Sequence, residues 1–238
     1  MTHHQSSLKR VAVIIPALNE APNLRRLLPV VQAQGVGQII IGDNGSTDGT
    51  ADVARQHHAT VADAPARGYG AACHAALQRL CDDIEVVIFI NADLTDDPTL
   101  VPAMTNPIFR DECDLTIGIR VAPLRDHGSM SLPQRFGDRL ATHLIHLSWG
   151  YRFYDLGPFR AIRRSSLERI DMQDRAFGWT IEMQIRALQE GLRIQQLPVP
   201  YRRSPTPSKI GGTIRGVAFA GYCILSTWFR LRRTDDHK

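Results

Sequence analysis

Two short polar segments carry side chains that could bind a cation or a polar ligand. The first is Asn91-Ala92-Asp93, in which the side chains of residues 91 and 93 leave an extended chain on the same side. Amide and carboxylate oxygens are the donors that Mg²⁺ and Mn²⁺ prefer, so the pair predicts a site for a hard divalent cation. A triplet of this kind is also common in ordinary turns, and its position must decide between the two.

The second segment is DNGSTDGT, residues 43–50. Gly45 permits a tight turn, and Asp48 can cap a helix that continues to residue 57. An ordinary junction between a strand and a helix accounts for both of these residues. It does not account for Asp43, a carboxylate at the very end of an apolar run.

Both segments follow apolar runs that predict buried strands. Helical patterns separate these runs, and this alternation is typical of a parallel sheet with helices on both faces. Ligands bind such sheets outside the carboxyl ends of the strands, where Asp43, Asn91 and Asp93 would lie. Strands are predicted at 11–15, 38–42, 59–62 and 85–90, and helices at 22–34, 48–57 and 69–80.

The second half of the chain is less regular. The patterns predict a strand at 113–119, a loop at 121–131, a helix at 132–149, a strand at 157–162, a helix at 178–190, an edge strand at 192–199 and a basic, proline-rich loop at 201–212. No repeat or linker divides the chain. The expected organisation is one domain over residues 1–212 with a C-terminal segment, 213–238.

The composition excludes several classes of protein. With 238 residues, 43% hydrophobic and 22% charged, the chain is neither disordered, collagen-like nor a coiled coil. The four cysteines, at positions 73, 81, 113 and 223, form no CxxC pair, so neither a disulfide framework nor a structural zinc is expected. Reduced thiols and a polar N-terminal decapeptide favour a cytoplasmic location.

The formal net charge of +4 is unevenly distributed. Residues 1–119 hold 8 basic and 14 acidic side chains, whereas residues 120–238 hold 20 basic and 10 acidic ones. A chance imbalance of surface charge is one explanation. The functional alternative is an acidic half that handles a cation and a basic half that meets an anionic partner.

Seven segments in order resemble the family 2 glycosyltransferases. They are VIIPALNE (13–20), IIIGDNGSTDGT (39–50), ARGYGAAC (66–73), VVIFINADLTDDP (86–98), YDLGPFRA (154–161), FGWTIEMQIRA (177–187) and SKI (208–210). The resemblance is closest to the bacterial branch similar to dolichyl-phosphate mannosyltransferase and polyprenyl-phosphate glucosyltransferases. It implies an α/β fold of the GT-A, Rossmann-like type, with a mixed, mostly parallel sheet and helices on both faces.

The resemblance also implies which residues bind the nucleotide sugar. Asp93 matches the metal-binding carboxylate of the family's DxD signature, and Asn91 replaces the first carboxylate, so Asp93 and Asn91 are the expected ligands of Mg²⁺ or Mn²⁺. The positions that match the donor pocket are Pro16, Ala17, Leu18, Glu20, Asp43, Arg67, Gly68, Asn91, Ala92 and Asp93.

A further set matches the family's acceptor side. Asp155 stands where relatives carry an aspartate that faces the sugar and acceptor, and with Asp93 it is the expected catalytic residue. Arginines suit phosphate because the guanidinium binds it in a bidentate manner. The candidates for an acceptor phosphate are Arg120, Arg135, Arg139, Arg202 and Lys209. Glu182 matches a family glutamate, for which a structural role is an equal alternative.

Residues 216–229 are 14 uncharged residues between Arg215 and Arg230. This stretch is shorter than the ~20 residues that a membrane span needs. Its aromatic end and the arginines that follow suit a helix at a membrane interface. A helix docked on the domain, or in a homodimer interface, is the alternative.

The combined expectation is an inverting enzyme. It would move a sugar from a UDP-glucose or GDP-mannose type of donor to an acceptor, favoured to be polyprenyl phosphate, at the cytoplasmic face of a membrane and without a nucleic-acid partner. A small soluble hydroxyl acceptor is the rival, and Asn91 leaves room for a non-catalytic sugar-nucleotide binder. PALNE, residues 16–20, lacks the glycine-rich loop of nucleotidyltransferases, and residues 68–73 lack the last glycine of a dinucleotide fingerprint.

Overall fold

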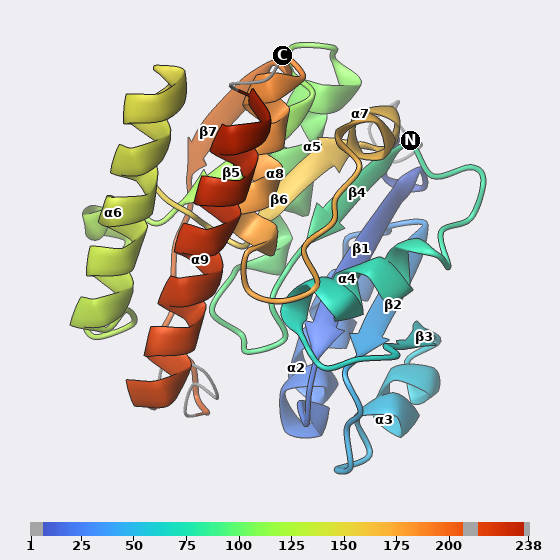
Figure 1. Cartoon of the computed structure of the whole chain (residues 1–238). Helices are drawn as coiled ribbons and strands as arrows, with labels where there is room; N and C mark the ends of the chain where they lie inside the picture. Colours follow the sequence, from blue (N-terminus) through green and yellow to red (C-terminus); the bar gives the residue numbers. More distant parts are fainter. Residues whose placement is uncertain (1–6, 207–213, 236–238) are drawn as a thin grey trace.

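The computed structural model describes residues 7–206 and 214–235, and these build a seven-stranded sheet with helices on both faces (Figure 1). The strands are β1 (Val11–Ala17), β2 (Gln38–Asp43), β3 (Thr60–Asp63), β4 (Val86–Phe89), β5 (Leu115–Ile119), β6 (Arg160–Arg163) and β7 (Ile194–Pro198). The helices are α2 (Ala21–Ala33), α3 (Thr50–Gln56), α4 (Tyr69–Leu77), α5 (Val101–Phe109), α6 (Leu132–Trp149), α7 (Arg164–Ile170), α8 (Trp179–Gln189) and α9 (Ile214–Asp235).

The strand order is β3-β2-β1-β4-β6-β5-β7. Strands β1 to β4 are parallel to one another, β6 is antiparallel to both β4 and β5, and β7 is parallel to β5. The expected α/β class, with a mixed and mostly parallel sheet, is therefore confirmed. The register aligns Ala17 with Asp43 and Asp43 with Asp63, so the ends of three strands meet at one edge.

Alternating side chains of the strands supply two cores. On β1, Val11, Val13 and Ile15 pack with α2 and α5, whereas Ala12 and Ile14 pack with α4, α6 and α8. Because successive strand residues point to opposite faces, a short β-branched strand serves both layers. The close approach of α4 requires Gly42 in β2, since a Cβ there would lie 2.3 Å from the Ala72 carbonyl oxygen.

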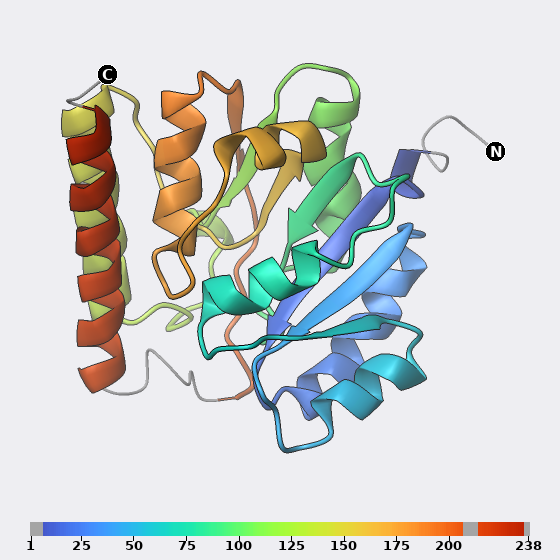
Figure 2. The same cartoon turned by 45° about the vertical axis from the view of Figure 1, so that its right-hand side comes forward.

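Helix α9 packs against α6 and α8 (Figure 2). Cys223, Thr227 and Leu231 are buried on the packed side, and the Trp228 Nε1–H donates to Ser148 Oγ of α6 at 3.1 Å. None of the helices within the described residues is long and apolar enough to cross a membrane.

Several predicted elements differ from the structure. The strand expected at 157–162 begins only at Arg160, because the backbone before it forms the loop that carries Asp155. Helix α3 is capped at Gly49, with φ +81°, and not at Asp48, although Asp48 Oδ1 accepts a hydrogen bond from the Thr50 amide at 3.0 Å. Helices α5 and α7 were not predicted, and α5 contains Pro107 in its interior.

Candidate functional site

A cavity of about 460 Å³ opens at the edge where β1, β2 and β4 end. Nearly all of the residues predicted for a nucleotide sugar lie on its wall. The lining residues are Pro16, Ala17, Leu18, Glu20, Asn44, Arg67, Gly68, Tyr69, Ala72, Asn91, Ala92, Asp93, Ala176, Phe177, Ser204, Thr206 and Phe219. The sheet therefore brings the ends of three strands to one cavity, and loops and helices that are distant in the sequence complete its wall.

The wall between β2 and α4 is held by Asn44, a residue that the motif analysis did not single out. Its side chain accepts a hydrogen bond from the Gly68 amide and donates one to the Gly68 carbonyl, both at 2.8 Å. Gly68 has φ +149°, and a Cβ there would lie 2.1 Å from the Arg175 carbonyl oxygen. Only glycine fits this contact, so the loop with Arg67 is fixed against the loop that precedes α8.

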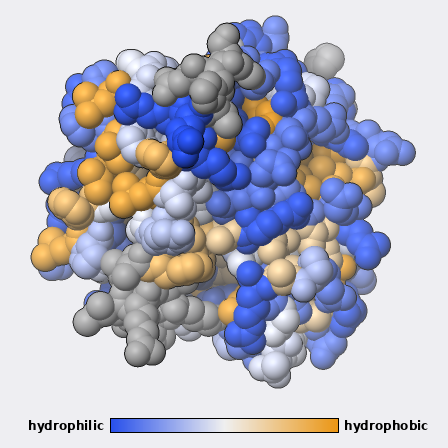
Figure 3. Space-filling model, viewed as in Figure 1, coloured by the Kyte–Doolittle hydropathy of each residue, from blue (hydrophilic) through white to orange (hydrophobic). Residues whose placement is uncertain are grey.

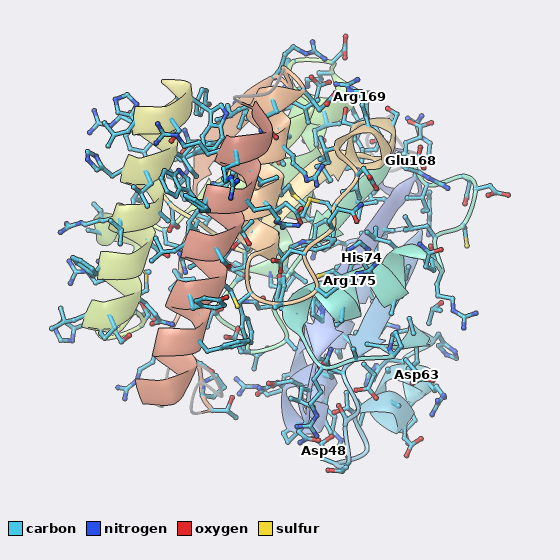
Figure 4. The ribbon with its side chains drawn as sticks, viewed as in Figure 1. Asp48, Asp63, His74, Glu168, Arg169 and Arg175 are labelled. Atoms are coloured by element: carbon cyan, nitrogen blue, oxygen red, sulfur yellow. The ribbon has the colours of Figure 1, made fainter. Side chains whose placement is uncertain are left out.

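The loop before α8 also had no predicted role. Its Arg175 and Ala176 carbonyl oxygens accept hydrogen bonds from the first amides of α4, and Ala176 and Phe177 line the cavity. Figure 4 shows Arg175 beside His74 of α4. Burial and then the nearby Arg175 lower the pKa of His74 to about 4, so this imidazole is neutral at physiological pH.

Of the residues predicted to bind the nucleotide sugar, Asp43 is the one that does not line the cavity. Its side chain is buried, and Oδ1 accepts hydrogen bonds from the Ser46 amide, at 3.1 Å, and from the Ser46 hydroxyl. The carboxylate thus fixes the turn after β2, and the neighbouring Asn44 occupies the wall in its place.

Asn91 and Asp93 follow β4, and both reach the cavity. Asp93 Oδ1 accepts hydrogen bonds from the Thr95 amide at 3.2 Å and the Thr95 hydroxyl at 2.7 Å. Burial raises the pKa of Asp93 despite these bonds, and the nearby charge of Glu20 adds to the increase. A cation bound at this point would favour the ionised form of Asp93 and so lower its pKa.

Asp96 is a second carboxylate beside this site that the sequence analysis did not identify. It is 3% exposed, and Oδ2 accepts a hydrogen bond from the Asn91 amide at 3.3 Å. Oδ1 is buried and has no hydrogen-bond partner within residues 7–206 and 214–235. Burial, followed by the charge of Asp93, raises the pKa of Asp96 to about 7.

These donors fit a cation that is shared with a phosphate-bearing ligand. In the part of the chain that the structure describes, no group of three or more His, Cys, Asp or Glu side chains could hold a metal alone. Mg²⁺ and similar ions are commonly bound by one or two carboxylates, with phosphate oxygens and waters as the other ligands. Asp93 and Asn91, both on the cavity wall, provide an oxygen-only pair of that kind, and the buried Asp96 lies behind them.

Asp155 lies next to this region, in a buried cluster with Arg120 and Asp138. Arg120 Nε donates to Asp155 Oδ2 at 2.7 Å and Nη2 donates to Asp155 Oδ1 at 2.6 Å, which is a bidentate pair. The Arg120 amide adds a bond of 2.8 Å to Asp155, and Nη2 also reaches Asp138 Oδ2 of α6 at 2.7 Å. The guanidinium lies 5.0 Å from the ring centre of Tyr201.

The two carboxyl groups of this cluster have different pKa values. Burial raises the pKa of Asp138 to about 7, with Asp155 adding to the increase and Arg120 opposing it. Burial also opposes ionisation of Asp155, but the charge and hydrogen bonds of Arg120 outweigh it and lower the Asp155 pKa. Asp155 is therefore an ionised partner of Arg120 and a weak proton acceptor.

Arg120 was expected to bind an acceptor phosphate. In the structure its guanidinium binds Asp155 and Asp138, and its side chain is only 9% exposed. Arg135 and Arg139 are on α6, and neither side chain has an ion pair within the described residues. Arg202 is exposed, with its Nη2 3.4 Å from Asp97 Oδ2. Lys209 lies outside the described residues.

The backbone of the Asp155 loop is held from behind by two buried side chains. Gln184 Nε2 donates to the Asp155 carbonyl at 2.9 Å, and Arg160 donates to the carbonyls of Gly157 and Thr180. Glu182, for which two roles were open, is fully buried and accepts bonds from the Gln173 and Asp174 amides. These contacts support the structural role for Glu182.

The raised pKa of Asp138 predicts a pH-dependent stability. Between about pH 4 and pH 7 the folded chain holds a proton on Asp138 that the unfolded chain has lost, so this group lowers the free energy of unfolding as pH rises through that window. Asp138→Asn removes the titration. Urea unfolding should show equal stability of variant and wild type near pH 4, and a variant more stable by about 2–4 kcal/mol at pH 8. If the free energies of unfolding of variant and wild type differ by the same amount at every pH in this range, Asp138 does not hold a proton in the folded chain.

Comparisons with known proteins agree with this geometry. The family model described as Glycosyl transferase family 2 matches residues 12–171. An uncharacterized glycosyltransferase of Mycobacterium tuberculosis is 33% identical over 225 residues, which cover 92% of this chain and 96% of the relative. A dolichyl-phosphate hexose transferase of Haloferax volcanii is 27% identical over 223 residues, with 90% and 94% covered.

Solved structures show the same fold. Glucosyl-3-phosphoglycerate synthase from Mycobacterium tuberculosis, solved with Mn²⁺, uridine diphosphate and glucosyl-3-phosphoglycerate, has a TM-score of 0.77 to this chain at 20% identity, covering 96% of this chain and 82% of that one. Mannosyl-3-phosphoglycerate synthase from Rubrobacter xylanophilus has a TM-score of 0.79 at 18% identity, covering 99% and 79%. By its sequence and its GT-A fold, the chain belongs to glycosyl transferase family 2.

Proposed function

We propose that this glycosyltransferase moves a hexose from UDP- or GDP-hexose to polyprenyl phosphate, with inversion at the anomeric carbon. The observation that carries the proposal is the cavity at the carboxyl edge of β1, β2 and β4, where Glu20, Arg67 and Asp93 come together. The dolichyl-phosphate hexose transferase relative, similar over nearly its whole length, supports the choice of acceptor.

In this proposal the donor lies along the cavity. Pro16, Ala17 and Leu18 border the nucleoside, Glu20 accepts hydrogen bonds from it, and Arg67 with Gly68 contacts the nucleotide. Asp43 acts through the turn that it fixes, and Asn44 takes the place on the wall. The related synthase structure with uridine diphosphate supports a uridine nucleotide as the first donor to test.

Asp93 and Asn91 would hold Mg²⁺ or Mn²⁺, with Asp96 behind them. When bound, the cation supplies positive charge that neutralises the leaving diphosphate. The chain itself aligns the donor and excludes water from the cavity. The Mn²⁺ of the related synthase supports a divalent cation in this role.

The proposed acceptor matches the state of Asp155. A phosphate acceptor is already ionised at neutral pH, so it needs no strong base, and Asp155 is bound by Arg120 with its pKa lowered. Asp155 then acts by keeping Arg120 and the surrounding loop in place. Arg135 and Arg139, which have no ion pair within the described residues, remain as the proposed phosphate ligands.

A second acceptor class is favoured by the solved relatives. Glucosyl-3-phosphoglycerate synthase has been crystallised in complex with phosphoglyceric acid, a small molecule that carries a hydroxyl group. A hydroxyl group must lose its proton on transfer, so this acceptor would require Asp155 to be released from Arg120 and to act as the base.

Arg135→Ala should separate these alternatives. We expect transfer to a short-chain polyprenyl phosphate to fall by about ten- to a hundredfold, because a charge-assisted contact to phosphate is lost, while slow hydrolysis of the donor stays unchanged. Mass spectrometry of both products measures the two rates in one reaction. Arg25→Ala, an exposed arginine of α2 on the other side of the sheet, is the matched control.

The opposite pattern would overturn the polyprenyl-phosphate proposal. If Asp155→Asn abolishes transfer while Arg135→Ala and Arg139→Ala stay active, the acceptor is a hydroxyl and Asp155 is its base. A panel with phosphoglyceric acid in place of the lipid would then show the preferred acceptor directly.

A further inference from the structure

Helices α6 and α9 expose large apolar side chains that a covered helix would bury. Phe136 is 68% exposed and Tyr222 is 69% exposed. The spacing of these residues follows the helical repeat, so each helix presents one apolar stripe to the outside. The stripes consist of Leu132, Phe136, Leu140 and Leu147 on α6, and of Phe219, Tyr222, Leu225 and Phe229 on α9; together they are called the α6–α9 face below.

The two helices run side by side in the same direction (Figures 1 and 2). The bond between Trp228 and Ser148 joins them near their C-terminal ends. Figure 3 shows apolar surface gathered over the side of the molecule where α6 and α9 lie. A concentration of exposed apolar side chains of this kind marks an interaction surface.

The charges on this face favour an anionic partner. The sequence of α6 and α9 contains six arginines and two aspartates. Asp138 bonds Arg120, and Arg230 lies 3.6 Å from the buried Glu182 of α8, so these two charges do not belong to the outer face. Arg232 lies 5.5 Å from the ring centre of Trp228, and Arg233 lies 5.6 Å from that of Phe229. Aromatic rings beside arginines are typical of helices that lie in a lipid headgroup layer.

The face is continuous with the mouth of the cavity. Phe219, at the N-terminal end of the α9 stripe, is 52% exposed and also lines the cavity. Its ring contacts the ring of Phe177, another lining residue, with 6.0 Å between the centres. A surface bound to this face would therefore border the entrance of the cavity.

We propose that the α6–α9 face docks the enzyme on an anionic lipid surface, with the Phe219 end of the cavity turned toward the bilayer. Because the helices cannot span a membrane, the stripes would enter only the headgroup boundary. A second copy of the chain is a poorer occupant, since pairing this face with itself would oppose two arginine-rich surfaces. The role in delivering a lipid acceptor rests on the proposed function, whereas the docking itself does not.

Vesicle binding by the full chain tests the docking separately from catalysis. The vesicles contain phosphatidylcholine and phosphatidylglycerol and no polyprenyl phosphate, and binding is measured by flotation at low salt. The double variant Phe136→Ser/Tyr222→Ser should bind at least about tenfold more weakly, because two aromatic side chains no longer enter the interface. Arg233→Gln, at an exposed arginine beside Phe229, should weaken binding about fivefold, and 0.5 M salt should weaken the wild type further.

The matched control is Arg25→Gln/Val30→Ser on α2, an exposed arginine and an exposed apolar residue on the opposite layer. Donor hydrolysis without vesicles shows that each variant is folded, and it tests the proposed function on its own. The docking proposal is overturned if the wild type does not bind, or if the α6–α9 variant and the control bind equally. It is also overturned if sedimentation shows a dimer that Phe136→Ser/Tyr222→Ser dissociates.

Discussion

Replacing Asp93 by alanine should lower the rate of hexose transfer by at least about a hundredfold, while the fold is retained. The carboxylate lies on the cavity wall, its pKa is raised by burial and by Glu20, and it is the one charged donor in the Asn91–Asp93 pair. Removing a side chain that holds a cation beside a leaving diphosphate lowers the rate by a factor of this size, because negative charge that develops in the transition state is no longer neutralised. Transfer at saturating donor, with Mn²⁺ titrated, measures it.

A structural role of Asp93 must be separated from the role of its charge. Asp93→Asn keeps an oxygen that can accept the two bonds from Thr95, so the turn after β4 should survive. We expect this variant to lose nearly as much activity as Asp93→Ala and to need much more Mn²⁺. Full activity of Asp93→Asn in the presence of a chelator would exclude the metal role.

Removing both carboxylates beside Arg120 should destabilise the protein strongly. In the wild type, Asp155 is the counterion of the buried guanidinium, and its charge helps to raise the pKa of Asp138. Once Asp155 is replaced, the ionised Asp138 can take over as counterion, since its Oδ2 lies 2.7 Å from Arg120 Nη2. Asp155→Asn alone should therefore cost about 1–2 kcal/mol, whereas the double variant with Asp138→Asn should cost about 3–5 kcal/mol, because a buried charge is left without a counterion. Urea unfolding at pH 8 measures both.

Arg120→Met in the doubly substituted background is the control for charge. It removes the unpaired guanidinium and keeps a side chain of similar length, so it should recover much of the lost free energy. If the double variant is no less stable than Asp155→Asn, the two carboxylates do not share the neutralisation of Arg120.

Much of the sheet could be predicted from the sequence, and the reasons are local. The runs at 11–15, 38–42 and 85–90 are apolar enough to be buried on both faces, and the structure places β1, β2 and β4 there. The helix predicted at 132–149 has the observed bounds of α6, with a Ser131 capping box at its start. Helix α5 was not predicted because Pro102 and Pro107 interrupt its pattern, although proline is tolerated in a first turn.

Part of the candidate site could also be predicted from the sequence, and part could not. Residues that follow strands, such as Glu20 and Asp93, could be placed at the cavity because parallel strands end at one edge. The partners of Arg120 could not be predicted, since Asp138 is on a helix and Asp155 is in a loop, and only packing brings them together. Phe177 and Phe219 were not predicted to line the cavity for a similar reason. They lie far along the sequence from the strands that end there, and only packing brings them to the wall.

The antiparallel strand β6 affects how the protein is made. It lies between β4 and β5, and it pairs Arg163 with Val86 across a large separation in sequence. On the ribosome, β1 to β4 can assemble first, but β4 remains an edge strand until β6 has emerged. The run VVIF, fully buried in the finished protein, is then a surface open to chaperones and to aggregation. Contacts between residues this distant in the sequence also slow folding. Strands β1 to β4 therefore reach their final stability only after β6 has paired with β4.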